Sequence, residues 1–222
     1  MKIRTLIAGQ VALLFLLNTG VRAQTLTRFD AKPGAGMKVR IEGTSTVHDW
    51  QVEGHLIAGS VEAGSNFPTE PGQDVKPGKI EARAIARIPV TSLKSIEKDG
   101  SPYSDKMDEV MYGKLKADAH RWIVFRVTEL TLKEPAKSKD APYVFDARGE
   151  LEVAGVTNQV ALPVNVLPLG DKKLKISGST TVKMTDFGVQ PPVLIGLLST
   201  GDPVKLSFEW PVQQRKTAEA AK

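Results

Sequence analysis

Polar and apolar residues alternate along most of the chain with a period of two, which is typical of β-strands that bury one face. One segment shows the pattern clearly, because Phe145 and Ala147 point to one face and Asp146 points to the other. The alternation predicts eight strands, over residues 37–43, 50–58, 80–88, 122–132, 143–153, 160–166, 174–184 and 204–210.

Several features interrupt this alternation. The apolar phase changes within residues 122–132, which predicts a β-bulge near Thr128. The segment AGVTN at residues 154–158 holds turn-forming residues between two strands and predicts a hairpin. Residues 64–78 and 134–142 are rich in Pro, Gly and Lys, and we expect them to be exposed loops.

One segment has the spacing of an amphipathic helix. Ser104 can cap its first turn, where Asp105 and Asp108 favour the positive end of the helix dipole. A shorter helical turn is expected at residues 91–95. The apolar stripe of the longer helix consists of Met107, Val110, Met111 and Leu115.

Eight amphipathic strands with mostly short connections favour an antiparallel sheet whose apolar face must be covered. One strong helix cannot cover it, whereas closing the sheet on itself removes both exposed edges. We therefore predict an all-β fold, an eight-stranded antiparallel β-barrel with one amphipathic helix packed at or over an end. Small residues in the apolar phase, such as Ala82, Ala84 and Gly149, leave room for a ligand. A β-sandwich or a barrel packed solid stays open as an alternative.

Residues 1–23 have the layout of a secretory signal peptide. Lys2 precedes a mostly apolar run over residues 6–17, and Ala23 supplies a small residue for cleavage before Gln24. An uncleaved anchor is the alternative, but the run is shorter than the roughly 20 residues that span a bilayer. The chain has no cysteine for lipid attachment. We expect a soluble periplasmic protein, with extracellular release left open.

Removal of the signal peptide lowers the net charge. The full chain has 30 Lys and Arg against 25 Asp and Glu, and removal of the peptide's Lys2, Arg4 and Arg22 leaves 27 against 25, a net of +2. This small, scattered charge indicates no nucleic-acid partner. The remaining chain fits one domain over residues 24–212, with a flexible tail over 213–222 and no transmembrane segment.

The motif HDW at residues 48–50 invites a catalytic interpretation. A triad needs groups brought together from separate parts of the chain, whereas neighbours on a strand such as His48 and Asp49 point to opposite sides. A polar corner that bonds the backbone is the simpler interpretation. The three histidines lack the spacing of a zinc site. We therefore expect neither catalytic residues nor a metal.

The segments GTSTVHDW at residues 43–50, SDKMDEVMYGKLKADAHRWIVFRVTEL at 104–130, GELEVAGVTNQVALPVNV at 149–166, and KMTDFGVQPP with GDPVKLSF at 183–208 occur in this order along the chain. Together they resemble the YceI-like family of exported bacterial proteins, over about residues 37–212. The resemblance implies a lipocalin-like barrel, a homodimer, and an apolar lumen that binds a polyisoprenoid or an isoprenoid quinone. It implies no required cofactor.

The segment TDFGVQPPVLIGLL at residues 185–198 is unusually apolar for a connection. Its two prolines exclude a helix interior and a central strand. We expect the segment to lie across the barrel or its mouth, unpaired, and to add Leu194 and Ile195 to the lumen wall.

These observations predict an exported lipid-binding barrel, not an enzyme, that sequesters or carries a polyisoprenoid-type, quinone-like amphiphile. The alternative is a solid-core structural or protein-interaction barrel of the envelope, and a hydrolase built on His48 and Asp49 is a distant third. The expected lipid contacts are Trp50, Val52, Leu56, Ile80, Ala82, Ala84, Phe125, Phe145, Leu151, Ile176, Val182, Phe187, Leu194, Ile195, Phe208 and Trp210.

Overall fold

The computed structural model describes residues 26–32, 34, 36–194 and 198–216. The expected signal peptide and Ile195 lie outside the described residues, and Leu194 is described only as part of a strand.

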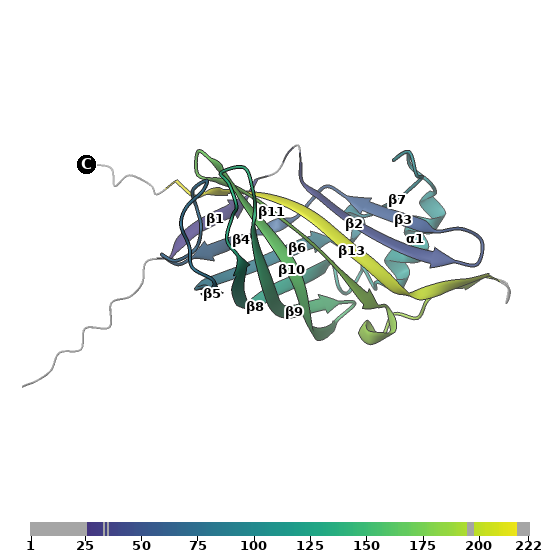
Figure 1. Cartoon of the computed structure of the whole chain (residues 1–222). Helices are drawn as coiled ribbons and strands as arrows, with labels where there is room; N and C mark the ends of the chain where they lie inside the picture. The colour runs from purple at the N-terminus through teal and green to yellow at the C-terminus, as the bar shows by residue number, and fades with distance from the viewer. Residues whose placement is uncertain (1–25, 33, 35, 195–197, 217–222) are drawn as a thin grey trace, which may run out of the picture.

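Eight antiparallel strands close a β-barrel, as the alternation predicts (Figure 1). The ring closes because β13 pairs with β1 at its C-terminal end. In order around the ring the strands are β1 (Thr27–Ala31), β4 (Ala58–Ala63), β6 (Ala82–Pro89), β8 (Trp122–Glu134), β9 (Tyr143–Val153), β10 (Val156–Gly170), β11 (Lys173–Lys183) and β13 (Leu198–Gln214).

Three further strands extend the sheet beyond the ring. β2 (Lys38–Ser45) pairs with the N-terminal part of β13, and β3 (Trp50–Gly54) and β7 (Lys94–Ile96) follow it outward. This extension and the helix α1 (Asp105–Lys114) lie at the end of the molecule away from β1 (Figure 1). The remaining short elements are β5 (Gly78–Lys79), η1 (Val90–Ser92), η2 (Thr185–Phe187) and β12 (Val193–Leu194).

The ring therefore contains only part of the strands that the alternation predicts. β6, β8, β9, β10, β11 and β13 were expected, but β2 and β3 lie outside the ring, and β1 and β4 take their places. The reason is geometric: β1 and β2 lie one after the other along the same edge of β13, and only β1 also pairs with β4.

Local details of the prediction are confirmed. The pairing of β8 with β9 shifts register between Val127 and Glu129, which places the bulge at Thr128. Val153 pairs with Val156 across the expected hairpin turn. The Ser104 side chain accepts a hydrogen bond from the backbone N–H of Met107 and caps α1.

The segment after β4 closes one end of the barrel instead of forming an exposed loop, so that expectation is wrong for its apolar residues. Phe67 is buried and stacks on Phe145, with ring centroids 5.9 Å apart. Val75 is also buried. The Tyr143 hydroxyl donates to the carbonyl oxygen of Gln73, and burial raises the pKa of Tyr143.

The barrel also extends past its expected C-terminal boundary at residue 212. Gln213 and Gln214 belong to β13, where Gln214 pairs with Phe29 of β1. Arg215 then forms an ion pair with Asp30, with Nε to Oδ2 at 2.6 Å. The start of the expected tail is thus part of the contact that closes the ring.

Candidate functional site

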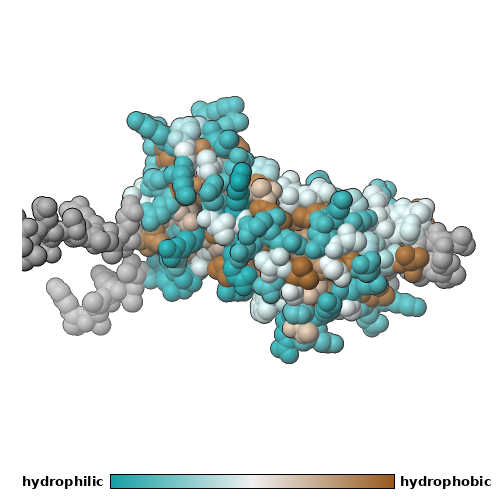
Figure 2. Space-filling model, turned by 90° about the horizontal axis from the view of Figure 1, so that it is seen from below, coloured by the Kyte–Doolittle hydropathy of each residue, from teal (hydrophilic) through white to brown (hydrophobic). Residues whose placement is uncertain are grey.

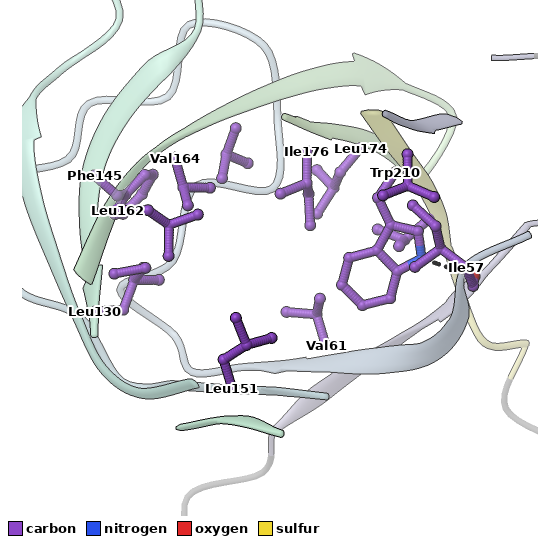
Figure 3. Close-up of a cluster of buried hydrophobic side chains, with 14 of the residues drawn as sticks. Ile57, Val61, Leu130, Phe145, Leu151, Leu162, Val164, Leu174, Ile176 and Trp210 are labelled. Carbon is purple, nitrogen blue, oxygen red and sulfur yellow. Dashed lines mark hydrogen bonds between the residues drawn. The ribbon is translucent and has the colours of Figure 1, made fainter. Parts of the chain in front are cut away.

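The barrel interior holds an apolar cavity of about 140 Å³. Figure 3 shows aliphatic side chains from opposite walls, among them Val61, Leu162 and Ile176, pointing toward a common centre. Trp210 reaches into the same space, and its indole N–H donates to the carbonyl oxygen of Ile57 at 3.2 Å. The interior is therefore lined for apolar contact and is not packed solid.

A second cavity of about 200 Å³ adjoins the first, and the two share Ile41, Ile123 and Leu206 in their walls. α1 and the segment around η2 supply much of its lining. The polar groups among its lining residues are few: Ser95, Lys114 and Thr200. The two cavities together form an elongated apolar space that runs from the barrel toward α1.

The wall around the second cavity is divided along a seam. β10 and β11 pair from Val164 and Gly178 toward the end beside β1, and within the described residues no ladder joins β10 residues 156–163 to β11 residues 179–183. The two strands diverge visibly toward the end that carries α1 (Figure 1). Half-exposed residues from both sides of this seam, Val160 and Val182, line the cavities.

η2 covers this seam. Asp202 of β13 accepts hydrogen bonds from the Thr185 N–H at 2.9 Å and from the Thr185 hydroxyl at 2.7 Å, and these bonds lower the pKa of Asp202. On the other side the Asn158 amide donates to the Asp186 carbonyl oxygen at 2.7 Å. Phe187, only 2% exposed, fills the space beneath.

α1 is held mainly to β7. The Asp108 carboxylate is buried, accepts a hydrogen bond from the Ser95 N–H at 2.7 Å and pairs with the Lys94 ammonium at 3.1 Å. Burial alone would raise the pKa of Asp108, but the bonds from Ser95 and Lys94 hold it below its ordinary value. The Tyr112 hydroxyl donates to the Leu93 carbonyl oxygen at 2.7 Å. The helix thus covers the second cavity as part of the half of the molecule that contains β7.

The inward glycines do not create the empty space that the sequence suggested. At Gly149 an added Cβ would lie 2.2 Å from the Arg126 carbonyl oxygen and 2.9 Å from the Phe125 ring. At Gly178 it would lie 3.0 Å from the Phe208 ring. These two glycines make room for aromatic side chains that line the first cavity. The empty space comes instead from the alanines of β6, whose short side chains line the same cavity.

The HDW segment forms a corner between β2 and β3. Ser45 Oγ accepts hydrogen bonds from the N–H groups of Val47 and His48 and donates to the His48 carbonyl oxygen at 2.7 Å. It thus bonds the His48 backbone instead of its ring. The ring Nδ1 lies 2.8 Å from the Asp49 carbonyl oxygen, and Nε2 lies 3.4 Å from the Tyr103 hydroxyl. This arrangement fits the polar corner that the sequence predicts and forms no nucleophile–base pair.

The structure places most of the expected lipid contacts on the cavity walls. Phe145 and Ile80 are buried outside the lining of both cavities, and the placements of Leu194 and Ile195 side chains lie outside the described residues. The first cavity is lined by Ala82, Ala84, Phe125, Leu151, Ile176, Phe208 and Trp210, and the second by Trp50, Val52, Val182 and Phe187.

Leu56 differs from these residues because it is 42% exposed and also lines neither cavity. The strand predicted over residues 50–58 continues past Gly54, where β3 ends. Ile57 is buried in place of Leu56, since its N–H contacts Met37 Sδ and its carbonyl accepts from Trp210. The contact of Ile57 with Trp210 joins residues far apart in the sequence and gives no local signal.

The segment before β13 adds apolar lining through residues other than Leu194 and Ile195, and part of it pairs. Phe187, Val189 and Pro192 line the second cavity. Val193 and Leu194 form β12 against β13, so the expectation of an unpaired segment is wrong there. Edge pairing is compatible with the preceding prolines, because Pro192 stands before the strand and needs to donate no ladder bond. The Val193 side chain is 66% exposed and faces away from the cavities.

The family model described as a YceI-like domain matches residues 35–211. The chain belongs to the YceI-like family. The match includes all the lining residues of both cavities but not β1, so the strand that closes this barrel precedes it.

Solved structures share the fold of this YceI-like protein. Burkholderia cenocepacia BcnA is 17% identical with a TM-score of 0.57, and the match covers 79% of this chain and 95% of BcnA. A polyisoprenoid binding domain from Saccharophagus degradans, implicated in plant cell wall breakdown, is 11% identical with a TM-score of 0.59, and the match covers 86% of this chain and 99% of that domain. No curated protein shows significant sequence similarity to the chain.

Proposed function

We propose that this YceI-like protein is an exported carrier or sequestering protein for a polyisoprenoid-type amphiphile. The observation that carries the proposal is the elongated apolar space formed by the two adjoining cavities. Burial contributes about 0.8 kcal/mol for each CH₂ group, so a branched hydrocarbon chain can bind there without a polar anchor. The polyisoprenoid binding named for the Saccharophagus degradans domain, which shares the fold, supports this ligand class.

The cavity volumes set the length of chain that fits without movement. An apolar cavity of about 150 Å³ holds one benzene ring. Cavities of about 140 and 200 Å³ therefore accept roughly one or two five-carbon units each. A chain of about 15 carbons fits the described conformation, and a longer quinone-like chain requires the walls to separate or the chain to emerge.

We assign a binding role without catalysis, because the interior offers apolar contacts and the polar corner at His48 forms no nucleophile–base pair. No cofactor is required for this role. The homodimer implied by the family resemblance stays a prediction. Sedimentation velocity of the mature protein measures its oligomeric state and tests this prediction.

Export is part of the proposal. The small residue Ala23 before Gln24 and the apolar run at residues 6–17 support cleavage between Ala23 and Gln24. The helices of the described residues are too short and too polar to cross a bilayer. Intact-mass analysis of the protein recovered from the periplasm should give a chain that begins at Gln24, with or without cyclisation of this residue. A mass that matches all 222 residues would contradict export by cleavage.

A cavity-filling variant tests the binding site. Ala84 lines the first cavity, whereas Arg83 on the same strand is exposed. Ala84→Trp should weaken farnesol binding at least tenfold, since the indole occupies the space of the chain, and overpacking should cost about 1–3 kcal/mol of stability. Arg83→Trp is the matched control and should leave binding intact. Titration of farnesol, with far-ultraviolet circular dichroism to verify the fold, measures both.

Native mass spectrometry of protein purified from its own periplasm, followed by organic extraction, identifies the natural ligand.

Equal binding of farnesol by Ala84→Trp and Arg83→Trp would contradict an internal site. It would favour a barrel that acts through its surface.

A further inference from the structure

The first cavity ends before the barrel does. On β9 the inward residues Leu151 and Ala147 line it, whereas the next inward residue, Phe145, is buried and does not. On β13 the lining stops in the same way between Trp210 and Val212. Toward the end beside β1, the last lining residues of the other strands are Val61 of β4, Ala82 of β6, Leu130 of β8, Val166 of β10 and Ile176 of β11.

The barrel interior beyond this point is filled by side chains. Phe29, Tyr143, Leu174 and Val212 come from four different strands, are at most 1% exposed and line neither cavity. Protein interiors of this kind pack as densely as organic crystals. A further five-carbon unit of a bound chain therefore has no space in this layer.

The Phe67 ring forms the boundary between the cavity and the filled layer. Phe67 belongs to the segment after β4 that covers this end of the barrel, and it is the residue of that segment that lines the first cavity. Its side chain is buried, and its ring stacks on that of Phe145 with an angle of 14° between the two planes. One ring thus faces the cavity, and the other lies behind it.

Hydrogen bonds hold Phe67 in this position. Its N–H donates to the Gly64 carbonyl oxygen at 3.1 Å, and the Gly64 N–H donates to the Glu81 carbonyl oxygen at 2.7 Å. The side chain of the neighbouring Asn66 donates to the Lys79 carbonyl oxygen at 3.3 Å and accepts from the Glu81 N–H at 3.2 Å. These bonds tie the segment to the residues that lead into β6. The ring can leave the cavity end only by breaking them or by entering the filled layer.

A chain that outgrows the cavity gains little on the outside of the protein. On the face shown in Figure 2, apolar side chains reach the surface in small groups among polar ones. Apolar binding free energy is roughly proportional to the apolar area that is removed from water. Units of the chain that emerge from the barrel therefore add little affinity.

We propose that the Phe67 ring is the end stop of the lipid site and limits the buried chain to about three five-carbon units. This inference rests on the proposed binding of an isoprenoid chain and adds its length class. Removal of the ring leaves space for about one more unit, because a cavity of about 150 Å³ holds one benzene ring. A ring added at Ala82 should remove about one unit, since Ala82 lines the same cavity and pairs with Ala63, just before the segment of Phe67.

The test compares geraniol, farnesol and geranylgeraniol, which differ by one five-carbon unit each and share the same head. Binding to the mature protein is followed by tryptophan fluorescence below the solubility limit of each alcohol, because Trp210 lines the first cavity. The affinity should rise at least tenfold from geraniol to farnesol, since the added unit is buried. It should change less than about threefold from farnesol to geranylgeraniol, since the next unit stays in water.

Variants at the cavity end should move this limit in opposite directions. Phe67→Ala should make geranylgeraniol bind at least tenfold more tightly than farnesol, and the milder change Phe67→Leu should shift the same ratio by about threefold. Ala82→Phe should reduce the gain from geraniol to farnesol to less than about threefold. Ratios of affinities are compared because a loss of stability weakens the binding of all three alcohols alike.

Two controls separate the length limit from general damage to the core. Val75→Ala removes apolar volume from a buried residue of the same segment that lines neither cavity, and it should leave both ratios as in the wild-type protein. Arg83→Phe adds the same ring as Ala82→Phe on the exposed face of β6 and should also change neither ratio. Far-ultraviolet circular dichroism verifies the fold of every variant.

The outcomes separate the two proposals. If none of the three alcohols binds the wild-type protein, the proposed function is overturned. If the wild-type affinity rises a further tenfold from farnesol to geranylgeraniol, the internal site stands and the end stop is wrong. The end stop is also wrong if both folded Phe67 variants keep the wild-type ratio, or if Val75→Ala shifts it as much as Phe67→Ala does.

Discussion

Gly149 and Phe125 show how single residues shape the cavity wall. The backbone of Gly149 approaches the Arg126 carbonyl so closely that no side chain fits, and the Phe125 ring lies over it. The ring is thereby held against the wall, where it lines the first cavity. The size of the cavity thus depends on a glycine that does not itself line it.

Gly149→Ala should destabilise the protein by about 1–3 kcal/mol, because the added methyl group must displace backbone or the Phe125 ring. Gly113 on α1 is the matched control, since an added Cβ there meets no atom within 4 Å. Gly113→Ala should stabilise the protein by about 0.5–1 kcal/mol, as alanine favours a helix. Urea unfolding of both variants measures the difference, and equal effects of the two changes would disprove the role assigned to Gly149.

The sequence predicts the faces of such residues wherever a strand is regular. Ala82, Phe125 and Phe208 lie on the cavity wall in the phase that alternation assigns. At Leu56 the same rule places a side chain inward that the structure leaves exposed, because the strand has already ended. Alternation predicts which face of a strand each side chain lies on, but it does not predict the residue at which the hydrogen-bonded ladder ends.

At the scale of elements, α1 is attached through a buried carboxylate as well as through its apolar stripe. Val110 and Met107 of the stripe are 39% and 36% exposed, whereas Asp108 is only 4% exposed. The sequence suggested that Asp108 interacts with the helix dipole, and its contacts with Ser95 and Lys94 of β7 could not be read from local spacing. This carboxylate links the cover of the second cavity to the sheet.

The attachment of α1 should depend on pH. Folding lowers the pKa of this carboxylate. Such a group stabilises the folded state at pH values above its unfolded pKa of about 3.9, and this stabilisation is lost as the pH falls through the folded pKa. Asp108→Asn should therefore cost about 1–3 kcal/mol at pH 7 and reduce the loss of stability in acid. Urea unfolding between about pH 2 and 7 measures this. Glu109→Gln, at an exposed neighbouring residue, should leave the pH dependence of stability unchanged. If Asp108→Asn shows the same pH dependence as the wild-type protein, the link between Asp108 and the attachment of α1 is contradicted.

Two of the strands missing from the sequence prediction, β1 and β4, are the ones that complete the ring. β1 and β4 have the sequences TRFDA and AGSVEA, which are short and poor in large apolar residues. β-propensity reflects packing against neighbouring strands, and such segments have little of their own. Their pairing with each other and with β13 arises from long-range contacts. The class of fold could therefore be predicted, but not which strands complete it.

At the scale of the whole molecule, the two halves of the wall are joined firmly at one end and loosely at the other. Toward β1 the ladders are continuous around the ring. Along the seam, β10 residues 156–163 have no described ladder to β11. Among the described residues, η2 is tied to β10 by one side-chain hydrogen bond, from the Asn158 amide to the Asp186 carbonyl oxygen. On the other side α1 and its capping residue Ser104 are tied to β7 through Asp108 and Ser104, and Tyr112 bonds the carbonyl oxygen of Leu93 just before β7. Separation at the η2 seam breaks fewer polar contacts, so we expect a chain to enter there.

A disulfide across the seam tests this expectation in a chain that has no cysteine of its own. Asn158→Cys with Asp186→Cys should, when oxidised, slow the association and release of farnesol at least tenfold, because β10 and η2 can no longer separate. Reduction should restore the rates. The matched control is Glu150→Cys with Gln159→Cys, which joins Cα partners of β9 and β10 that are already held by a ladder. Stopped-flow tryptophan fluorescence measures loading, since Trp210 lines the first cavity and Trp50 the second. If the oxidised seam pair loads as fast as the control, the chain enters elsewhere, and the side covered by α1 becomes the candidate entrance.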